Sequence, residues 1–254
     1  FMSIVNTLPL ESNRQIKMNF DGGDLSSDAG LLLIKEFICK LGFVKLLKSV
    51  FKTNDTALRY HKDDENLWQV IYQILGAYFE DDCADELIHD PVLTAILDKR
   101  ALASQPTLSR FFNRMDETTL DQFYVLMRRF RKVVYAIKKP RLLLLDLDST
   151  LLDTYGHQEG EGFNFHYQSH GYHPLVCYDG MTGDLLKIEL RNGTNYSSTG
   201  VVEFLQPLLD EFLTDYPDLP LLLRGDSGFA KPELYDQCET NGVSYVICLK
   251  ENST

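Results

Sequence analysis

The chain has 254 residues, which is enough for one large domain or two modest ones. Hydrophobic residues make up 44% of the sequence, so a core can form. No apolar run approaches the roughly 20 residues of a membrane-spanning helix, so the sequence predicts no such helix. The five cysteines include no CxxC pair, so the sequence predicts neither a zinc ribbon nor a disulfide framework and favours reduced cytosolic thiols.

The net charge of −12 at first argues against a nucleic-acid partner, but it is unevenly distributed. Residues 1–139 carry 19 basic and 19 acidic side chains. The six basic and 18 acidic side chains of residues 140–254 therefore hold the whole imbalance. Such an acidic half is either a solvated surface or a carboxylate-lined site whose charge is offset by divalent metal.

The first half of the chain predicts helices. A cluster of capping residues, 26–28, precedes an apolar stretch from Leu31 to Leu41. Asp63 and Asp64 precede a second helix with apolar residues at i, i+3, i+4 and i+7 spacing. The residues on that face are Leu67, Val70, Ile71, Ile74, Leu75, Tyr78 and Phe79.

Two further helices complete this half. A short one starts near Pro106 or Thr107, and a longer one runs from about residue 118 to residue 137. The side chains expected to face inward on the longer helix are Leu120, Phe123, Met127, Phe130 and Val134. Pro140 disfavours helix at Lys139, so we place a boundary there between a helical N-terminal domain, 1–139, and a second domain, 140–254.

The second half predicts an α/β domain. Its expected elements, in chain order, are strands at 141–148, 172–178 and 185–190, a helix at 197–212, a strand at 219–223, a helix at 232–241 and a strand at 243–249. The segment Asp179–Asp184 is the loop of a hairpin, and two crossovers follow. This is the order of an RNase H-like mixed sheet, with strand order 3-2-1-4-5. Residues 149–171 are expected to form a long polar loop.

Three carboxylates belong to this predicted sheet. Asp146 and Asp148 are two residues apart on a strand, so both side chains point to the same face. Asp226 directly follows the fourth strand, which is a parallel neighbour of the first in this order. Two acids on a largely buried strand are costly unless a divalent cation compensates them. The alternatives are that one acid caps the turn after the first strand and that Asp226 is an ordinary loop acid.

Several motifs carry a resemblance to a known family. They are Asp146-Leu-Asp-Ser-Thr150, Gly171-Tyr-His-Pro-Leu175, Leu223-Arg-Gly-Asp-Ser-Gly-Phe229, Ser27-Asp-Ala-Gly-Leu31, Asp90-Pro91 and Ala103-Ser-Gln-Pro-Thr-Leu-Ser-Arg110. Together, and in this order, they resemble the DDE transposases of bacterial insertion sequences, specifically the 1380-type group (transposase DDE domain group 1). The resemblance covers nearly the whole chain from about residue 18.

The resemblance implies an enzyme that uses metal to cleave and transfer strands of DNA at insertion-sequence ends. Asp148 would be the first catalytic acid and metal ligand and Asp226 the second, with Asp146 competing for the first position. The implied cofactor is Mg²⁺ or Mn²⁺, and the implied partners are double-stranded transposon ends and target DNA. The family's proteins act in the bacterial cytoplasm at the nucleoid, and a homodimer is compatible with the resemblance.

The family's third acid is a Glu on a helix after the last strand. The sequence to Thr254 offers only Glu251, which follows the last strand too closely. We therefore expect an incomplete catalytic core, a two-metal site only in a longer protein, and no activity from this chain.

One basic run stands out beside the acids. From residue 128 to residue 141 the chain has no acidic residue, and it has seven basic ones: Arg128, Arg129, Arg131, Lys132, Lys138, Lys139 and Arg141. This pattern favours a surface that contacts DNA phosphates. The alternative is a solvated helix face. A helix-turn-helix near Thr107 is only weakly indicated.

Two other functions remain open. The segment Asp146–Leu151 also matches the first motif of haloacid dehalogenase-like phosphatases, in which the first Asp is a nucleophile. That fold needs a wider, mostly parallel sheet. A non-catalytic DNA-binding relic of a transposase is the other alternative. His166, His170 and His173 have a spacing that could bind a transition metal, but no acid or Cys nearby in the sequence completes the set.

Overall fold

The computed structural model describes residues 7–20, 22–23 and 25–250. The chain divides into two compact units, Phe1–Ala136 and Ile137–Thr254. The division falls in the last turn of a helix, just before the predicted boundary at Lys139.

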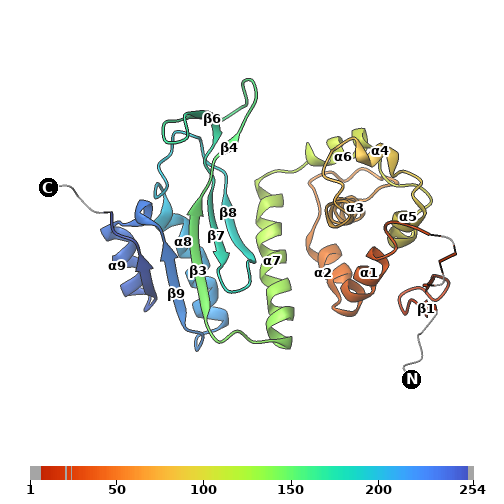
Figure 1. Ribbon diagram of the computed structural model, residues 1–254, viewed down its shortest axis with the longest axis horizontal. Helices are drawn as coiled ribbons and strands as arrows, with labels where there is room; N and C mark the ends of the chain where they lie inside the picture. Colours follow the sequence, from red (N-terminus) through yellow and green to blue (C-terminus); the bar gives the residue numbers. More distant parts are fainter. Residues whose placement is uncertain (1–6, 21, 24, 251–254) are drawn as a thin grey trace. The chain divides into compact units, whose positions relative to one another are not determined.

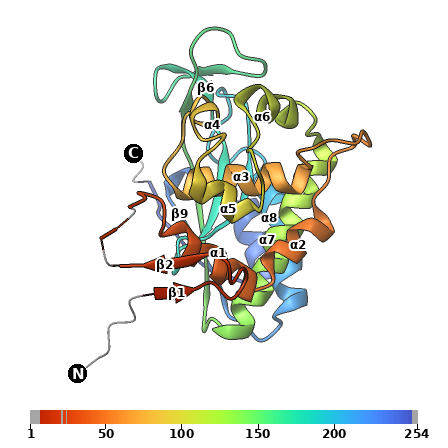
Figure 2. The same cartoon turned by 90° about the vertical axis from the view of Figure 1, so that its right-hand side faces the viewer.

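The first unit is mostly helical (Figures 1 and 2). Its helices are α1 (Leu31–Lys40), α2 (Phe43–Val50), α3 (Asp63–Leu75), α4 (Cys83–Glu86), α5 (Pro91–Leu97), α6 (Gln105–Phe112) and α7 (Glu117–Ile137). Two short antiparallel strands precede them, β1 (Thr7–Pro9) and β2 (Lys17–Asn19). The sequence analysis had not predicted these strands, which are only three residues long.

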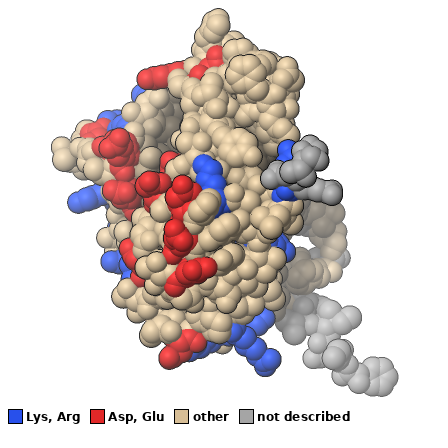
Figure 3. Space-filling model, turned by 90° about the vertical axis from the view of Figure 1, so that its left-hand side faces the viewer, with Lys and Arg blue, Asp and Glu red and all other residues tan. Residues whose placement is uncertain are grey.

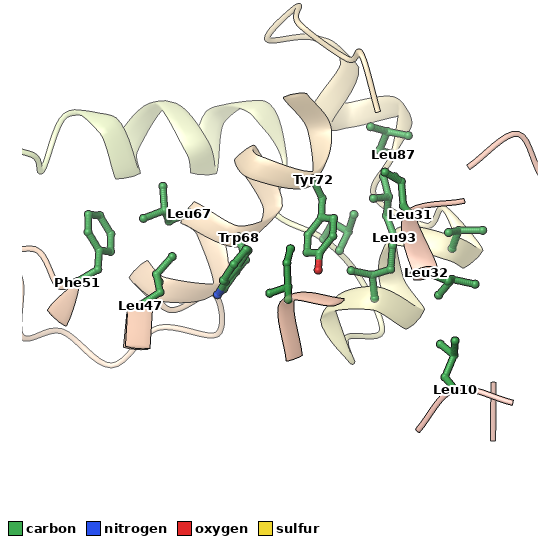
Figure 4. Close-up of a cluster of buried hydrophobic side chains, with 14 of the residues drawn as sticks. Leu10, Leu31, Leu32, Leu47, Phe51, Leu67, Trp68, Tyr72, Leu87 and Leu93 are labelled. Atoms are coloured by element: carbon green, nitrogen blue, oxygen red, sulfur yellow. The ribbon is translucent and has the colours of Figure 1, made fainter. Parts of the chain in front are cut away.

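One hydrophobic core holds the helices of this unit together (Figure 4). Trp68 and Tyr72 of α3 lie at its centre, with Leu47 of α2 and Leu93 of α5 beside them. Phe111 of α6 belongs to the same cluster and is completely buried. Burying each such side chain contributes about 1.5–3 kcal/mol.

The predicted inward face of α3 was only partly correct: Leu67 is buried and Ile71 packs against the core. Ile74 and Phe79 are exposed by 54% and 72%, whereas Trp68 and Tyr72 are buried. The helix ends at Leu75, so the periodicity that extended it to residue 79 does not continue. The buried face also includes Gln69, whose side-chain amide makes two hydrogen bonds of 2.8 Å with the backbone of Ala103. Gln69 can be buried although it is polar, because both groups of its side-chain amide have hydrogen-bond partners.

The predicted extent of α7 is confirmed, but its inward face is only partly correct. Phe123 and Phe130 pack against the core as expected. Leu120 and Val134 are exposed by 57% and 44%, and the fully buried side chain near the start of the helix is Thr119. The Thr119 hydroxyl donates a 3.0 Å hydrogen bond to the Asp116 carboxylate, which removes the cost of burying it. The first turn of the helix therefore buries Thr119, while Leu120 next to it is exposed.

The second unit is built on a five-stranded mixed sheet (Figure 1). Its strands are β3 (Leu143–Ser149), β7 (Leu175–Asp179), β8 (Leu185–Glu189), β9 (Leu221–Gly225) and β10 (Ser244–Ile247). Helices α8 (Val201–Asp215) and α9 (Pro232–Thr240) connect β8 to β9 and β9 to β10. The core side chains are mainly leucines of β3 and β9 together with Phe204, Leu209 and Phe212 of α8.

The strands lie in the order β8-β7-β3-β9-β10. β7 is antiparallel to both β3 and β8, and β9 is parallel to both β3 and β10. Numbered along the chain, these five strands have the order 3-2-1-4-5, so the mixed α/β fold is the RNase H-like one. The two antiparallel pairs do not fit the mostly parallel sheet that a haloacid dehalogenase-like phosphatase requires.

The predicted polar loop at residues 149–171 was wrong. This segment forms most of a second, three-stranded antiparallel sheet, β4-β6-β5, made of β4 (Leu152–Asp153), β5 (Gly162–Asn164) and β6 (Ser169–Tyr172). The predicted strand at 172–178 is interrupted between Tyr172 and Leu175, because Pro174 has no N–H to donate to a neighbouring strand. Figure 1 shows this small sheet beyond the carboxyl end of β3.

The Asp90-Pro91 motif has a structural role at the start of α5. The Asp90 carboxylate accepts hydrogen bonds from the backbone N–H groups of Val92 (2.9 Å) and Leu93 (2.7 Å). Pro91 occupies the first turn, where an N–H would have no partner within the helix. The motif therefore fixes where α5 begins.

Replacing Asp90 by Ala should lower the free energy of unfolding by about 1 kcal/mol, because two N–H groups at the start of α5 lose their acceptor. Urea denaturation followed by circular dichroism measures the effect. Asp82→Ala is the matched control, since Asp82 precedes α4 without capping it through its side chain. Equal stabilities for the two variants would contradict the capping role.

Candidate active site

Strand β3 places two of the predicted acids on one face of the sheet. Leu145 and Leu147 are buried on the other face, and Asp146 and Asp148 alternate with them. Asp146 is half-buried and Asp148 is exposed. The two-residue spacing therefore places both carboxylates on the more accessible face of the sheet, as the sequence predicted.

The pairing of β3 with β9 determines where Asp226 lies. The parallel register pairs Leu145 with Leu223 and Asp146 with Arg224. The paired residues end there, and the same register, if it continued for two more residues, would bring Asp148 opposite Asp226. Neighbouring strands are about 4.8 Å apart, so carboxylates at these positions can share a ligand. Both residues stand at the carboxyl ends of their strands and are exposed.

The turn after β9 orients the Asp226 side chain. Asp226 precedes a short 3₁₀ helix, Ser227–Phe229, and its Oδ1 accepts a 2.8 Å hydrogen bond from the backbone N–H of Gly228. Phe229 is buried and packs so closely on Gly225 that a Cβ there would lie 3.2 Å from the Phe229 side chain. The Arg-Gly-Asp-Ser-Gly-Phe sequence thus builds a tight turn that presents one carboxylate.

Asp146 has a partner that the sequence analysis missed. The Arg224 guanidinium donates through Nε to Asp146 Oδ1 at 2.8 Å and through Nη2 to Oδ2, which makes a two-pronged ion pair. The hydrogen bond and the charge of Asp146 together raise the pKa of Arg224. A signal was present in the sequence, because Arg224 lies two residues before Asp226 and so points to the same face of the sheet.

This ion pair distinguishes the two acids of β3. Both Asp146 oxygens are used by Arg224. Asp148 uses Oδ1 for a 2.7 Å bond from the N–H of Ser149, its neighbour in the chain. Asp148 and Asp226 are therefore the acids with oxygen atoms to offer a ligand, and Asp146 is compensated within the protein.

The donor set at this edge suits a hard divalent cation. Mg²⁺ and Mn²⁺ take carboxylate oxygens and water, and Mg²⁺ often binds through only one or two carboxylates plus substrate phosphates. In residues 7–250, where they are described, no group of three or more His, Cys, Asp or Glu side chains is placed to hold a metal. Asp148 and Asp226 together offer only two carboxylates, fewer than a complete cation cage needs.

The histidines whose spacing could bind a transition metal, His166, His170 and His173, do not form a metal-binding group among the described residues. His173 is buried, and its Nδ1 lies 2.8 Å from the carbonyl oxygen of Asn195, so Nδ1 carries a proton. His170 lies instead beside Glu161, with Nδ1 3.1 Å from a carboxylate oxygen. The pairing of β5 with β6 brings Glu161 close to His170, but no group of three or more potential ligands forms there among the described residues.

The residues of the predicted basic run differ in exposure. Arg129, Lys132, Lys138, Lys139 and Arg141 are exposed, whereas Arg128 and Arg131 are half-buried. Arg128 to Lys132 lie on α7, and Arg141 precedes β3. The acidic surface is elsewhere: Figure 3 shows Asp and Glu side chains gathered on a face on the side of α9.

The chain belongs to the family described as transposase DDE domain group 1, which matches residues 8–254. A search among curated proteins found no significant match. No helix in the described part of the chain is long and apolar enough to cross a membrane.

Three solved structures show weak similarity. The catalytic domain of the Mos1 mariner transposase matches with 12% sequence identity and a TM-score of 0.32, over 52% of this chain and 61% of that chain. The piggyBac transposase in a synaptic complex with hairpin DNA matches with 12% identity and a TM-score of 0.40, over 83% and 47%. The Mos1 paired-end complex with Mn matches with 12% identity and a TM-score of 0.30, over 89% and 69%. The chain thus spans less than two thirds of the first two.

Gly171 in the Gly-Tyr-His-Pro-Leu motif supports the small sheet beside the site. A Cβ at this position would lie 2.2 Å from the carbonyl oxygen of Leu152 on the neighbouring strand. Gly171→Ala should therefore push β4 and β6 apart and lower the free energy of unfolding by about 1–3 kcal/mol. Gly30→Ala is the control, because a Cβ at Gly30 meets nothing within 4 Å. Similar melting temperatures for both variants would show that β4 yields without cost.

Proposed function

We propose that this protein is a DNA transposase whose second unit cleaves and transfers DNA strands with a divalent metal held by Asp148 and Asp226. The observation that supports the proposal is the parallel register of β3 and β9, because its continuation by two residues would bring these two acids to one edge of an RNase H-like sheet. Membership of the DDE transposase family supports the same reaction class. Insertion-sequence ends are the proposed substrate.

Asp148 and Asp226 would hold the metal, through oxygens that Arg224 does not occupy. When bound, Mg²⁺ or Mn²⁺ would activate a water or a 3′-hydroxyl and stabilise the leaving oxygen of a phosphodiester. The turn at Gly228 keeps the Asp226 carboxylate oriented before metal arrives. Such prior orientation lowers the cost of assembling the charged site.

Asp146 would contribute to the site indirectly. Its negative charge is balanced by Arg224, so it adds little repulsion to the neighbouring Asp148. Arg224 is itself exposed, with 53% of its side chain accessible. We propose that the third acid of the family, a Glu on a helix after the last strand, lies outside the described residues.

The metal assignment is testable by Mn²⁺ binding, measured from the relaxation rate of water protons. Asp148→Asn and Asp226→Asn should each weaken Mn²⁺ binding by about tenfold or more, since each removes a charged oxygen ligand. Asp146→Asn should change it by less than about threefold, because Asp146 is already paired. The 254-residue chain alone should bind Mn²⁺ weakly and leave duplex DNA uncut, because two carboxylates form an incomplete cage.

Asp218→Asn is the matched control for charge, since Asp218 is an exposed acid in the turn before β9. A loss of Mn²⁺ binding in Asp146→Asn but not in Asp148→Asn would reverse the assignment of the first acid. Unchanged binding in all three site variants would instead favour a relic that binds DNA without catalysis. Cleavage by the 254-residue chain that Asp226→Asn abolishes would show that the third acid is dispensable.

DNA binding is proposed for the first unit and for the segment that links it to β3. Residues 140–254 carry the entire net charge of −12, so without metal they repel phosphate. The basic run at residues 128–141 offers exposed cations instead. Each cation that neutralises a phosphate releases counterions, so affinity should fall steeply with salt.

Four exposed members of the run provide a clean test of this surface. Their simultaneous replacement by Ala should weaken binding to all duplex sequences and flatten the salt dependence by up to about four units, near one per contact. The four are Arg129, Lys138, Lys139 and Arg141. Fluorescence anisotropy with labelled duplex DNA at several salt concentrations measures the slope, alongside a melting curve.

The control variant removes four exposed cations of the first unit outside the run, and so the same amount of charge: Arg14, Lys17, Lys45 and Lys48. If both quadruple variants lose the same affinity and slope, the attraction is only a general effect of charge. If the run variant is folded and keeps the wild-type slope, the basic run is a solvated face and DNA binds elsewhere.

A further inference from the structure

Arg191, at the start of the loop after β8, is a buried arginine whose side chain bonds to backbone carbonyl oxygens, while the charge of nearby Glu189 only partly offsets the cost of its burial. Only 8% of it is exposed, and burial lowers the pKa of its guanidinium. Its hydrogen bonds go to backbone carbonyl oxygens. Nε donates to His173 O at 3.0 Å, and Nη1 reaches the carbonyl oxygens of Tyr196, Ser197 and Thr199 at 3.5, 3.2 and 2.5 Å. Burying a cation is costly, so this one is expected to serve a specific purpose.

Arg191 and His173 form a reciprocal pair that closes the loop at residues 192–200. The N–H of His173 donates to the carbonyl oxygen of Arg191 at 2.9 Å, while Arg191 donates back to His173 O. His173 Nδ1 donates to the carbonyl oxygen of Asn195 at 2.8 Å. Together these bonds hold both the middle and the end of the loop from the start of β7.

The other side of the loop is fixed on the small sheet. The Asn164 side chain donates to the carbonyl oxygen of Gly193 at 2.8 Å, and the Asn192 side chain donates to Glu161 O at 2.8 Å. A Cβ at Gly193 would lie 2.2 Å from the carbonyl oxygen of Gly162, so the two backbones are in direct contact. The loop is therefore held on two sides and has little freedom to shift.

This loop in turn contacts the turn that carries Asp226. A Cβ at Gly228 would lie 3.2 Å from Ser197 Cβ and 3.0 Å from Asp226 Oδ1. Gly228 is also the residue whose N–H holds Asp226 Oδ1. Arg191 binds the carbonyl oxygen of Ser197, and Ser197 in turn packs against the turn that carries Asp226.

We propose that Arg191 is a positioning residue for Asp226, acting through Ser197 and Gly228 rather than by touching DNA or metal. The planar guanidinium donates to His173 O through Nε and to the carbonyl oxygens of residues 196, 197 and 199 through Nη1. A lysine ammonium, which has a single nitrogen, cannot bind both groups in this geometry. The inference rests on the proposed function, because it assumes that Asp226 is a metal ligand. It explains why the long segment between β3 and β9 folds back toward the catalytic edge.

The test is the Mn²⁺ affinity of the full chain, measured from water-proton relaxation, together with the melting temperature. Arg191→Met keeps the length of the stem but removes the guanidinium, and should weaken Mn²⁺ binding by about tenfold, as changes to groups that orient metal ligands do. Arg191→Lys should give a smaller loss. Gly228→Ala, which crowds Ser197 and Asp226 directly, should weaken Mn²⁺ binding without altering Arg191.

Lys187→Met is the matched control. Lys187 is also a partly buried cation that donates to a backbone carbonyl oxygen, that of Phe204, at 2.6 Å, and burial lowers its pKa. It lies on β8 and makes no bond to the loop. This variant should lose thermal stability but keep its Mn²⁺ affinity within about twofold, since it does not contact the 192–200 loop or the Asp226 turn.

The possible outcomes separate the two ideas. If Arg191→Met melts lower but binds Mn²⁺ as the wild type does, Arg191 is only structural and the inference is overturned. If Arg191→Met fails to fold, Arg191→Lys and Gly228→Ala decide in the same way. If Asp148→Asn and Asp226→Asn also leave Mn²⁺ binding unchanged, the proposed metal site itself fails, and the positioning role fails with it.

Discussion

The parallel pairing of β3 with β9 is the constraint on which the candidate site depends. A parallel ladder fixes not only which strands are neighbours but which residues face each other, and a slip of one residue would turn Asp226 to the opposite side. Buried leucines hold the register: Leu143, Leu145, Leu221 and Leu223 leave little room for such a slip. The hydrophobic core therefore sets the spacing of the two acids.

Much of this arrangement could be predicted from the sequence. The Asp-Leu-Asp spacing fixes a common face, and the order of strands and helices in residues 141–249 predicts that the first and fourth strands are neighbours. The first inference uses the alternation of side chains between the two faces of a strand, and the second uses the order of strands and helices along the chain. The positions of Asp146 and Asp148 on β3 follow from them directly.

Other features depend on contacts between distant residues and could not be predicted in the same way. The small sheet at 152–172 consists of strands of two to four residues, too short to show a period. The buried face of α3 includes Gln69, which is acceptable there only because the backbone of Ala103 meets it. Arg191 in the sequence is merely one charged residue, and its burial depends on a ring of carbonyl oxygens that only the folded loop creates.

The use of the few cations in the second unit explains how it could act on DNA in spite of its charge. Of the six basic residues in 140–254, Arg191 and Lys187 donate to backbone carbonyl oxygens and Arg224 binds Asp146. Half of the unit's basic side chains thus bind groups within the unit itself. If the proposed function holds, bound metal would have to offset the repulsion between this unit's acids and phosphate. Under the proposed function, a unit with this charge would bind DNA productively only with metal present, because the metal offsets the repulsion between its carboxylates and phosphate.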